Sequence, residues 1–315
     1  MKANYQEIEE LLQKRADNQA RINLIPYKGT PEVREENGEK HLYMRIRENG
    51  KLKYTYVGEY TDYLYQLLLK NSKEVRELTE NIRKITKQLN DLEFEDKEIP
   101  LKIAKNIDFA RINMKVNIYE QAMLEGVGTT FPQTEEIIEN GIVNGVSAND
   151  VQKILNLKHA WEFILDKDVI QSDSNLYMLC YIAKFVNEGF FKDGGRLRGV
   201  PVTIGGCKYI PPIPIEVDIK ETIEKIKNQD KEAVIIAIDL CLYCMRTQIF
   251  TDGNKRAAVI FANHYLISHG KGVLVVPEKN IKEFKKLLVN YYEHPEDQTI
   301  HNFMKENCWK KLQQG

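Results

Sequence analysis

The sequence predicts a mainly α-helical protein: a helical bundle with a β-hairpin flap, preceded by an N-terminal module of helix, β-hairpin and long helix. Three observations support this prediction. Apolar residues recur at helical spacing through most of the chain after Pro100. Two alternating runs joined by an Asn-Gly pair predict a hairpin near the N-terminus. A Gly- and Pro-rich stretch at 195–212 interrupts the helices. We expect two domains, residues 1–97 and 98–315.

The N-terminal module is predicted from two changes of pattern. Residues 4–20 have helical spacing, and the stretch "PYKGTPEVREENGEK" after them is expected to be a loop because prolines, glycines and charges mix in it. Then follow "HLYMRIR" and "KLKYTYV", rich in residues that favour strands. They are joined by Glu48, Asn49 and Gly50, and Asn-Gly is the strongest short signal for a hairpin.

The predicted hairpin at 41–57 has one apolar face and one basic, aromatic face. Leu42, Met44 and Ile46 alternate with Tyr43, Arg45 and Arg47. Together with Lys53, the second set could provide rings and cations for nucleic acid. A basic face that is merely solvated is the alternative.

The stretch 61–92 is predicted to be one long helix with a coiled-coil-like stripe. Leucine, isoleucine and valine keep 3,4 spacing from Leu64 to Leu92, and Asn71 interrupts the stripe. The stripe packs either on the helix at 4–20 of the same chain or on a second copy, which would make a homodimer. The acidic run "EFEDKEIP", ending at Pro100, predicts the domain boundary.

After Pro100 the pattern predicts a bundle of helices. The expected ranges are 101–124, 133–139, 148–165, 174–188, 216–229, 231–247, 254–269, 279–293 and 298–313. The stretch at 195–212 is expected to be a hairpin, because it has a Gly-Gly turn between short β-type runs and ends in prolines.

Composition limits the class of protein. The net charge is −1, so binding to nucleic acid or a membrane would need a local patch. No run approaches the ~18 apolar residues of a membrane span and no apolar leader begins the chain, so a cytoplasmic protein is expected. The five cysteines are scattered. Cys241 and Cys244 lie in an apolar run and are expected to be buried reduced thiols.

The stretch "QIFTDGNKR" predicts a phosphate-binding turn between two helices. A helix N-terminus offers unpaired N–H groups and a positive dipole to anions, and Gly253 permits the bend that exposes them. Asp252 offers a hard carboxylate for Mg²⁺. Arg256 could grip a terminal phosphate, and Asn254 could donate to a phosphate oxygen. Phe250 is expected to point inward and hold the loop in place. A plain Asp-Gly turn before a basic helix start is the alternative.

Three stretches resemble the Fic family. Its signature is H-P-F-x-(D/E)-G-N-(G/K)-R, and residues 250 and 252–256 match it in register. The stretch "GRLRGVPVTIGGCKYIPP" resembles the family's flap, which clamps an extended target segment by strand addition. Upstream, Glu125 and Gly126 match the inhibitory-helix pattern (S/T)-x-x-x-E-(G/N). The resemblance covers roughly residues 100–315.

The resemblance implies a Fic-type domain that binds ATP or another nucleotide with Mg²⁺ and transfers AMP to a protein hydroxyl. A protein target would dock at 195–212. Asp252 would hold the metal, and Glu125 would block the site by pairing with Arg256. A plain turn capped by Gly126 is the alternative for Glu125. The implied nucleotide-binding residues are Thr251, Gly253, Asn254, Lys255 and Arg256.

The sequence departs from the family at the residue that moves a proton. Gln248 stands at the general base, and an amide accepts no proton at physiological pH. A positioned base contributes about 10²–10⁴-fold, so AMP transfer should be weak or absent. Ile249 replaces the signature proline, and Gln121 replaces the Ser or Thr of the inhibitory motif. His264, further along the signature helix, is expected to be a core or surface residue. The catalytic set is therefore Gln248, Asn254 and Arg256, with the first degenerate.

Two functional hypotheses remain from the sequence. The protein could be a Fic-class enzyme that works without the histidine, on a phosphate or carboxylate nucleophile or with another nucleotide donor. It could instead be a pseudoenzyme that senses nucleotide or binds a target. Both require the phosphate-binding residues 252–256.

Overall fold

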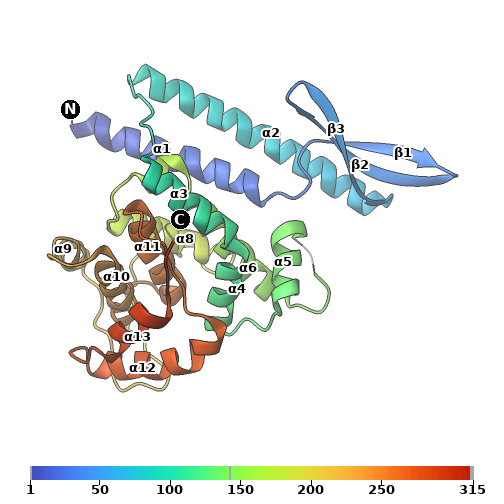
Figure 1. Cartoon of the computed structure of the whole chain (residues 1–315). Helices are drawn as coiled ribbons and strands as arrows, with labels where there is room; N and C mark the ends of the chain where they lie inside the picture. Colours follow the sequence, from blue (N-terminus) through green and yellow to red (C-terminus); the bar gives the residue numbers. More distant parts are fainter. Residues whose placement is uncertain (1, 142, 313–315) are drawn as a thin grey trace. The chain divides into compact units, whose positions relative to one another are not determined.

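The computed structural model describes residues 2–141 and 143–312, and these divide into two compact units. The first unit comprises residues 2–96 with 139–141, and the second 97–138 with 143–312. Both can be followed along the colour ramp of Figure 1. The predicted mainly helical fold is confirmed.

Two antiparallel helices form the frame of the first unit. α1 (Lys2–Leu24) packs along α2 (Asp62–Asp91), as Figure 1 shows. Leu11 of α1 is buried against Ile85 and Leu89 of α2. α2 begins at an N-cap, where the Thr61 hydroxyl accepts from the amide of Leu64 at 3.1 Å. The apolar stripe of α2 therefore packs on α1 of the same chain, which is one of the two arrangements expected from the sequence.

The sheet of the first unit has three antiparallel strands in the order β1-β2-β3. β1 (Thr30–Glu36), β2 (Glu39–Glu48) and β3 (Lys51–Glu59) follow one another along the chain. The expectation that 26–40 is a loop was wrong for Thr30–Glu36. Pro31 and the charges of β1 are tolerated because this is an edge strand, where a missing N–H breaks no ladder. Its turn is a second Asn-Gly pair, Asn37-Gly38, with φ of 55° and 82°.

One face of the sheet is covered by α2. Leu42 and Met44 of β2 are buried against Leu68 of α2. The register pairs Lys53 with Ile46, so Lys53 lies on the same side of the sheet as Leu42 and Met44. Its side chain is 63% exposed there and forms an ion pair with Glu48. The expectation that Lys53 shares a face with Tyr43 was therefore wrong.

The elements after Pro100 are mostly helices, and the longest connection between them lies between α8 and α9. They are α3 (Leu101–Ile112), α4 (Met114–Leu124), α5 (Phe131–Asn140), α6 (Ala148–Ile164), α7 (Lys167–Ile170), α8 (Leu176–Val186), α9 (Glu216–Lys227), α10 (Ala233–Thr247), α11 (Asn254–Ser268), β4 (Val273–Leu274), the 3₁₀ helix η1 (Glu278–Asn280), α12 (Ile281–Glu293), α13 (Thr299–Asn307) and β5 (Trp309–Lys310).

α11 is the central helix of the second unit. It packs on α10, α8, α6 and α3. Ala257, Ala258 and Ala262 are fully buried, and side chains this small let neighbouring helices approach closely. Trp161 of α6 and Phe185 of α8 are also fully buried. The signature helix is thus held from several sides.

Three sequence-based boundaries were wrong. Residues 195–212 contain no strand, although Cys207 does close a turn onto the carbonyl of Ile204 at 3.3 Å. The expected helix 101–124 is two helices that meet at Asn113. The last expected helix ends at Asn307, and β5 pairs with β4 beyond it.

Cys241 and Cys244 are buried in α10 as free thiols, and burial raises the pKa of both. None of the helices described is both long enough and apolar enough to cross a bilayer.

We predict that Leu89→Ala destabilises the first unit by about 2–5 kcal/mol, because it opens a cavity between α1 and α2. Hydrogen exchange of the α2 amides measures this in the intact chain, where a single two-state transition is not expected. Leu69→Ala is the matched control, since Leu69 is 38% exposed on the same helix. It should cost less than about 1 kcal/mol. Equal effects would contradict the packing described.

Candidate functional site

The signature stretch forms a tight turn between α10 and α11. Gln248 is the C-cap of α10 and Gly253 the N-cap of α11, and both have left-handed backbones, with φ of 49° and 74°. A Cβ at Gly253 would also meet the Asn187 Oδ1 atom at 2.6 Å. Only glycine therefore fits this position.

Asn187, at the end of α8, holds the turn from outside. Its Nδ2 donates to the carbonyl of Asp252 at 3.0 Å and to that of Gly194 at 3.1 Å. Asn187 is 1% exposed, and among the residues that the structure describes its Oδ1 has no hydrogen-bond partner. Nothing in the local sequence marks Asn187, because its role depends on packing between distant segments.

Asn254 closes the turn from inside. Its Oδ1 accepts from the Phe250 amide at 2.9 Å, and its Nδ2 donates to the Phe250 carbonyl at 2.8 Å and to Gln248 Oε1 at 3.1 Å. Phe250 is 2% exposed and points inward, as expected. Both N–H bonds of the Asn254 amide are thus used inside the loop, so a bond to phosphate would have to replace one of them.

Gln248 is bonded at both ends of its amide. Its Nε2 donates to the carbonyl of Met245 at 2.6 Å, while its Oε1 accepts from Asn254. The side chain links the last turn of α10 to the first residue of α11. Ile249 beside it is fully buried and adds to the core.

Arg256 lies on the first turn of α11 and is 3% exposed. Its guanidinium donates to the carbonyl of Val186 at 2.8 Å and pairs with Asp252 at 2.9 Å. Asp252, by contrast, has a side chain that is 53% exposed. The predicted metal ligand and the predicted phosphate ligand are therefore paired with each other.

Glu125 lies against both cations of the signature. Its carboxylate is 3.8 Å from Arg256 Nε and 3.5 Å from Lys255 Nζ, and its side chain is 15% exposed. Glu125 is also the C-cap of α4, and Gly126 follows with φ of 76°. Glu125 therefore has both of the roles expected for it: it ends α4 at a turn closed by Gly126, and its carboxylate contacts Lys255 and Arg256 of the signature.

Gln121, one turn before Glu125, fixes α4 to the signature helix. Its Nε2 donates to the carbonyl of Arg256 at 2.9 Å, and its Oε1 accepts from Trp161 Nε1 at 3.1 Å. The residue is 1% exposed. The departure from Ser or Thr thus supplies a longer side chain that reaches two partners.

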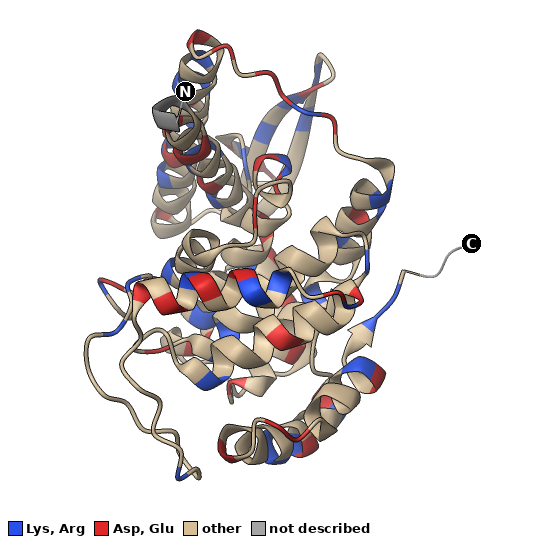
Figure 2. Ribbon diagram, turned by 90° about the vertical axis from the view of Figure 1, so that its left-hand side faces the viewer, with Lys and Arg blue, Asp and Glu red and all other residues tan. Residues whose placement is uncertain are grey.

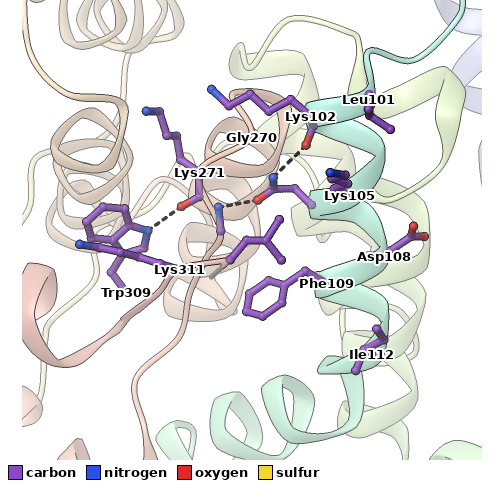
Figure 3. A pocket seen from close by; sticks show the side chains of 13 residues that line it. Leu101, Lys102, Lys105, Asp108, Phe109, Ile112, Gly270, Lys271, Trp309 and Lys311 are labelled. Carbon is purple, nitrogen blue, oxygen red and sulfur yellow. Dashed lines mark hydrogen bonds between the residues drawn. The ribbon is translucent and has the colours of Figure 1, made fainter. Parts of the chain in front are cut away.

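A small hollow opens beside the turn. Thr251 and Asp252 line it with Asn187, Phe191 and Lys192, and its volume is about 220 Å³. A larger hollow of about 1220 Å³ lies elsewhere on the same unit, between α3, the turn at Gly270 and Trp309. Figure 3 shows lysines at its rim and Phe109 on its wall. None of the predicted site residues lines it, so size alone does not mark the site.

Residues 174–266 match the model of the Fic/DOC family. The chain carries a Fic/DOC family domain. Residues 5–66 match a second model, described as a domain of unknown function (DUF6788). No curated protein matches the sequence.

Solved structures share the fold of the Fic domain. Fic-1 (residues 134–508) from C. elegans superposes with a TM-score of 0.50 at 18% identity, covering 76% of this chain and 72% of that one. A Fic domain containing signalling protein from Bacteroides thetaiotaomicron gives 0.50 at 18%, covering 61% and 75%. A Fic family protein from Desulfovibrio desulfuricans gives 0.51 at 15%, covering 67% and 73%.

Arg198 joins the long loop of the Fic domain to the signature turn. Its guanidinium donates to the carbonyls of Gln248 at 2.5 Å, Val200 at 2.8 Å and Pro212 at 2.6 Å. Its backbone amide donates to Ile249 at 3.0 Å. Arg198 is 3% exposed, and burial lowers its pKa. Because the partners of Arg198 are main-chain carbonyls, no sequence motif predicts these contacts.

The return limb of the loop is held by two further contacts. Arg246 of α10 stacks its guanidinium on the ring of Tyr209, 4.0 Å from its centre. Glu293 accepts from the Lys208 amide at 2.7 Å, which lowers the pKa of that carboxyl. The rest of the segment 199–215 is mostly apolar and exposed, and Lys208 is its only charged residue (Figure 2).

His264 is a core residue, which is one of the two placements expected from the sequence. Its ring is fully buried in α11, where Nδ1 lies 2.7 Å from the Ser174 hydroxyl and Nε2 lies 2.9 Å from the carbonyl of Val169. The carbonyl requires a proton on Nε2. Burial lowers the pKa of His264 to about 4, so it is neutral near pH 7.

We predict that Arg198→Met frees the loop, because it leaves buried carbonyls unpaired at a cost of roughly 1–3 kcal/mol each. Trypsin should then cut after Lys208 at least about tenfold faster, as the open population grows. Arg196→Met is the matched control, since its side chain is 81% exposed and only two positions away. Unchanged cleavage in Arg198→Met would show that this contact does not hold the loop.

Proposed function

We propose that the Fic domain binds a nucleoside triphosphate with Mg²⁺ at residues 251–256 in a form restrained by Glu125. We further propose that AMP transfer, the activity implied by the family, is weak or lost in the native chain. The observation that carries this proposal is the placement of Glu125 against Lys255 and Arg256, at 3.5 Å and 3.8 Å. The same cations would bind phosphate.

The first turn of α11 supplies the phosphate-binding groups. Gly253 begins the helix, so the amides that follow it lack helical partners and carry the positive end of the dipole. Lys255 and Arg256 add two charges, and Thr251 lies at the mouth of the adjoining hollow. A triphosphate suits this set because it presents several anionic oxygens close together.

Asp252 fits Mg²⁺ as a single protein ligand. The residues described contain no group of three or more His, Cys, Asp or Glu that could hold a metal ion by themselves. Mg²⁺ commonly takes one or two carboxylates and completes its shell with substrate phosphates and water. Asp252 is more than half exposed beside the phosphate-binding turn, so its carboxylate can be shared in this way. The ion would neutralise phosphate charge there.

Glu125 opposes this binding in two ways. Its carboxylate neutralises Arg256 and Lys255 and would repel a triphosphate at the same place. Nucleotide binding therefore requires Glu125 to move or to lose its charge.

Gln248 accounts for weak or absent transfer. An amide cannot take the proton of an attacking hydroxyl, and this amide is already bonded to Met245 and Asn254. A nucleophile that is already ionised, such as a phosphate or carboxylate, needs no base. An enzyme acting on such a group or using another nucleotide donor, and a nucleotide-sensing pseudoenzyme, are both consistent with this site.

The loop 195–212 suits a protein target in either case. Val200 and Ile210 of this loop are 54% and 65% exposed, and Ile213 and Ile215, which follow it directly, are 47% and 60% exposed. Its backbone forms no strand pairing of its own. An extended peptide could add to it and cover these side chains.

We predict that Glu125→Gln strengthens ATP–Mg²⁺ binding at least about tenfold, since it removes the competing charge while keeping the shape. Calorimetry on the full chain with ATP, GTP and a UDP-sugar measures this. Glu135→Gln is the matched control, because Glu135 pairs with a lysine on an exposed surface. Unchanged affinity would refute the restraint by Glu125, and no binding of any nucleotide by either form would refute the proposed site.

We predict that Gln248→His raises transfer from α-labelled ATP to protein by about 10²–10⁴-fold, because it restores a proton acceptor. Autoradiography of a lysate incubated with each variant measures the transfer. Gln248→His combined with Arg256→Ala should be silent. Equal labelling by the native chain and the single variant would mean that the reaction needs no base.

A further inference from the structure

The sheet of the first unit has one face that α2 does not cover, here called the uncovered face, and the strand register identifies its residues. Tyr43 pairs with Glu32 on one side and Tyr56 on the other, and Arg45 pairs with Tyr54. Paired residues lie on the same face of a sheet. Leu42 and Met44 belong to the opposite face, which α2 covers. The uncovered face therefore combines tyrosines with arginines.

The tyrosines of this face are partly exposed and lie next to one another. Tyr54 is 42% exposed and Tyr56 is 52% exposed. Tyr43 contacts Tyr56 edge to face, with ring centres 5.4 Å apart. Adjacent rings of this kind make a platform on which planar groups can stack.

Arg34 of β1 adds a cation to the platform. Its guanidinium lies 4.0 Å from the centre of the Tyr54 ring and 4.8 Å from that of Tyr43. Glu32 accepts from Arg34 Nε at 2.9 Å, which fixes the plane of the group. Strand β1 thus contributes to a face that the sequence had assigned to β2 and β3 alone.

Charge is unevenly distributed along the face. Toward the turn at 49–50 lie Arg45 and Arg47, and Arg45 is 3.7 Å from Glu32. Toward the other turn lie Glu36, Glu39 and Glu59. The charged residues of the sheet can be followed in Figure 2. A polyanion would therefore bind across the arginine half.

We propose that this Tyr–Arg face, formed by Arg34, Tyr43, Arg45, Arg47, Tyr54 and Tyr56, binds single-stranded nucleic acid. The arginines contact phosphates and the tyrosines stack on bases. A single strand fits better than a duplex because its bases present open ring faces, whereas paired bases present only their edges in the grooves. The short basic region limits the footprint to a few nucleotides. This proposal is independent of the nucleotide site of the Fic domain.

Fluorescence anisotropy of the full chain with a labelled oligonucleotide of about 20 thymidines tests the proposal. Arg45→Ala with Arg47→Ala should weaken binding at least about tenfold and reduce the salt slope by about 1.4, for two phosphates at about 0.7 each. Arg76→Ala with Arg83→Ala is the matched control on the exposed side of α2. It should leave the affinity unchanged.

The stacking component has its own test. Tyr54→Ala with Tyr56→Ala should weaken single-strand binding at least about tenfold, while Tyr63→Ala, a 75% exposed tyrosine on α2, should not. Arg256→Ala should have no effect. Failure of the native chain to bind the oligonucleotide would overturn the proposal. So would binding that favours the duplex and does not respond to the tyrosine variants.

Discussion

The structure of the candidate site depends on one tight turn between two buried helices. Asn254 bonds both main-chain groups of Phe250, and this closes the turn from inside. Gly253 provides the left-handed backbone without which α11 could not start in contact with Asn187. Because α11 is buried along most of its length, the turn cannot shift without disturbing the core. The positions of Asp252, Lys255 and Arg256 all follow from it.

Two other segments converge on this turn and connect it to the rest of the unit. α4 brings Gln121 and Glu125 to Arg256, so a helix far away in sequence sets the charge around the residues proposed to bind phosphate. Arg198 brings the long apolar loop to the carbonyl of Gln248. The proposed phosphate site, its proposed restraint by Glu125 and the attachment of the loop therefore share neighbours. A change at one of them should affect the other two.

The predicted chemistry of the site is one-sided. The residues predicted to bind phosphate and metal lie together at the turn, while the position of the family's proton acceptor carries an amide bonded at both ends. That amide has a structural role, since it ties the end of α10 to the start of α11. Glutamine at this position therefore supplies hydrogen bonds that the fold uses without offering a proton acceptor.

The sequence by itself determined most of the helices and the signature turn, because these depend on local periodicity and on a contiguous motif. It also predicted the phosphate-binding chemistry of residues 250–256 from that motif. It also supplied Glu125, through its spacing to Gly126. Only the tertiary structure decided the rest. Strand β1 contains Pro31 and is tolerated because it lies at a sheet edge. Lys53 lies on the same side of the sheet as Ile46 because the strand register, and not the composition, decides which face a residue occupies. Asn187, Gln121 and Arg198 act through main-chain groups of distant segments, and contacts to carbonyls leave no pattern in a sequence.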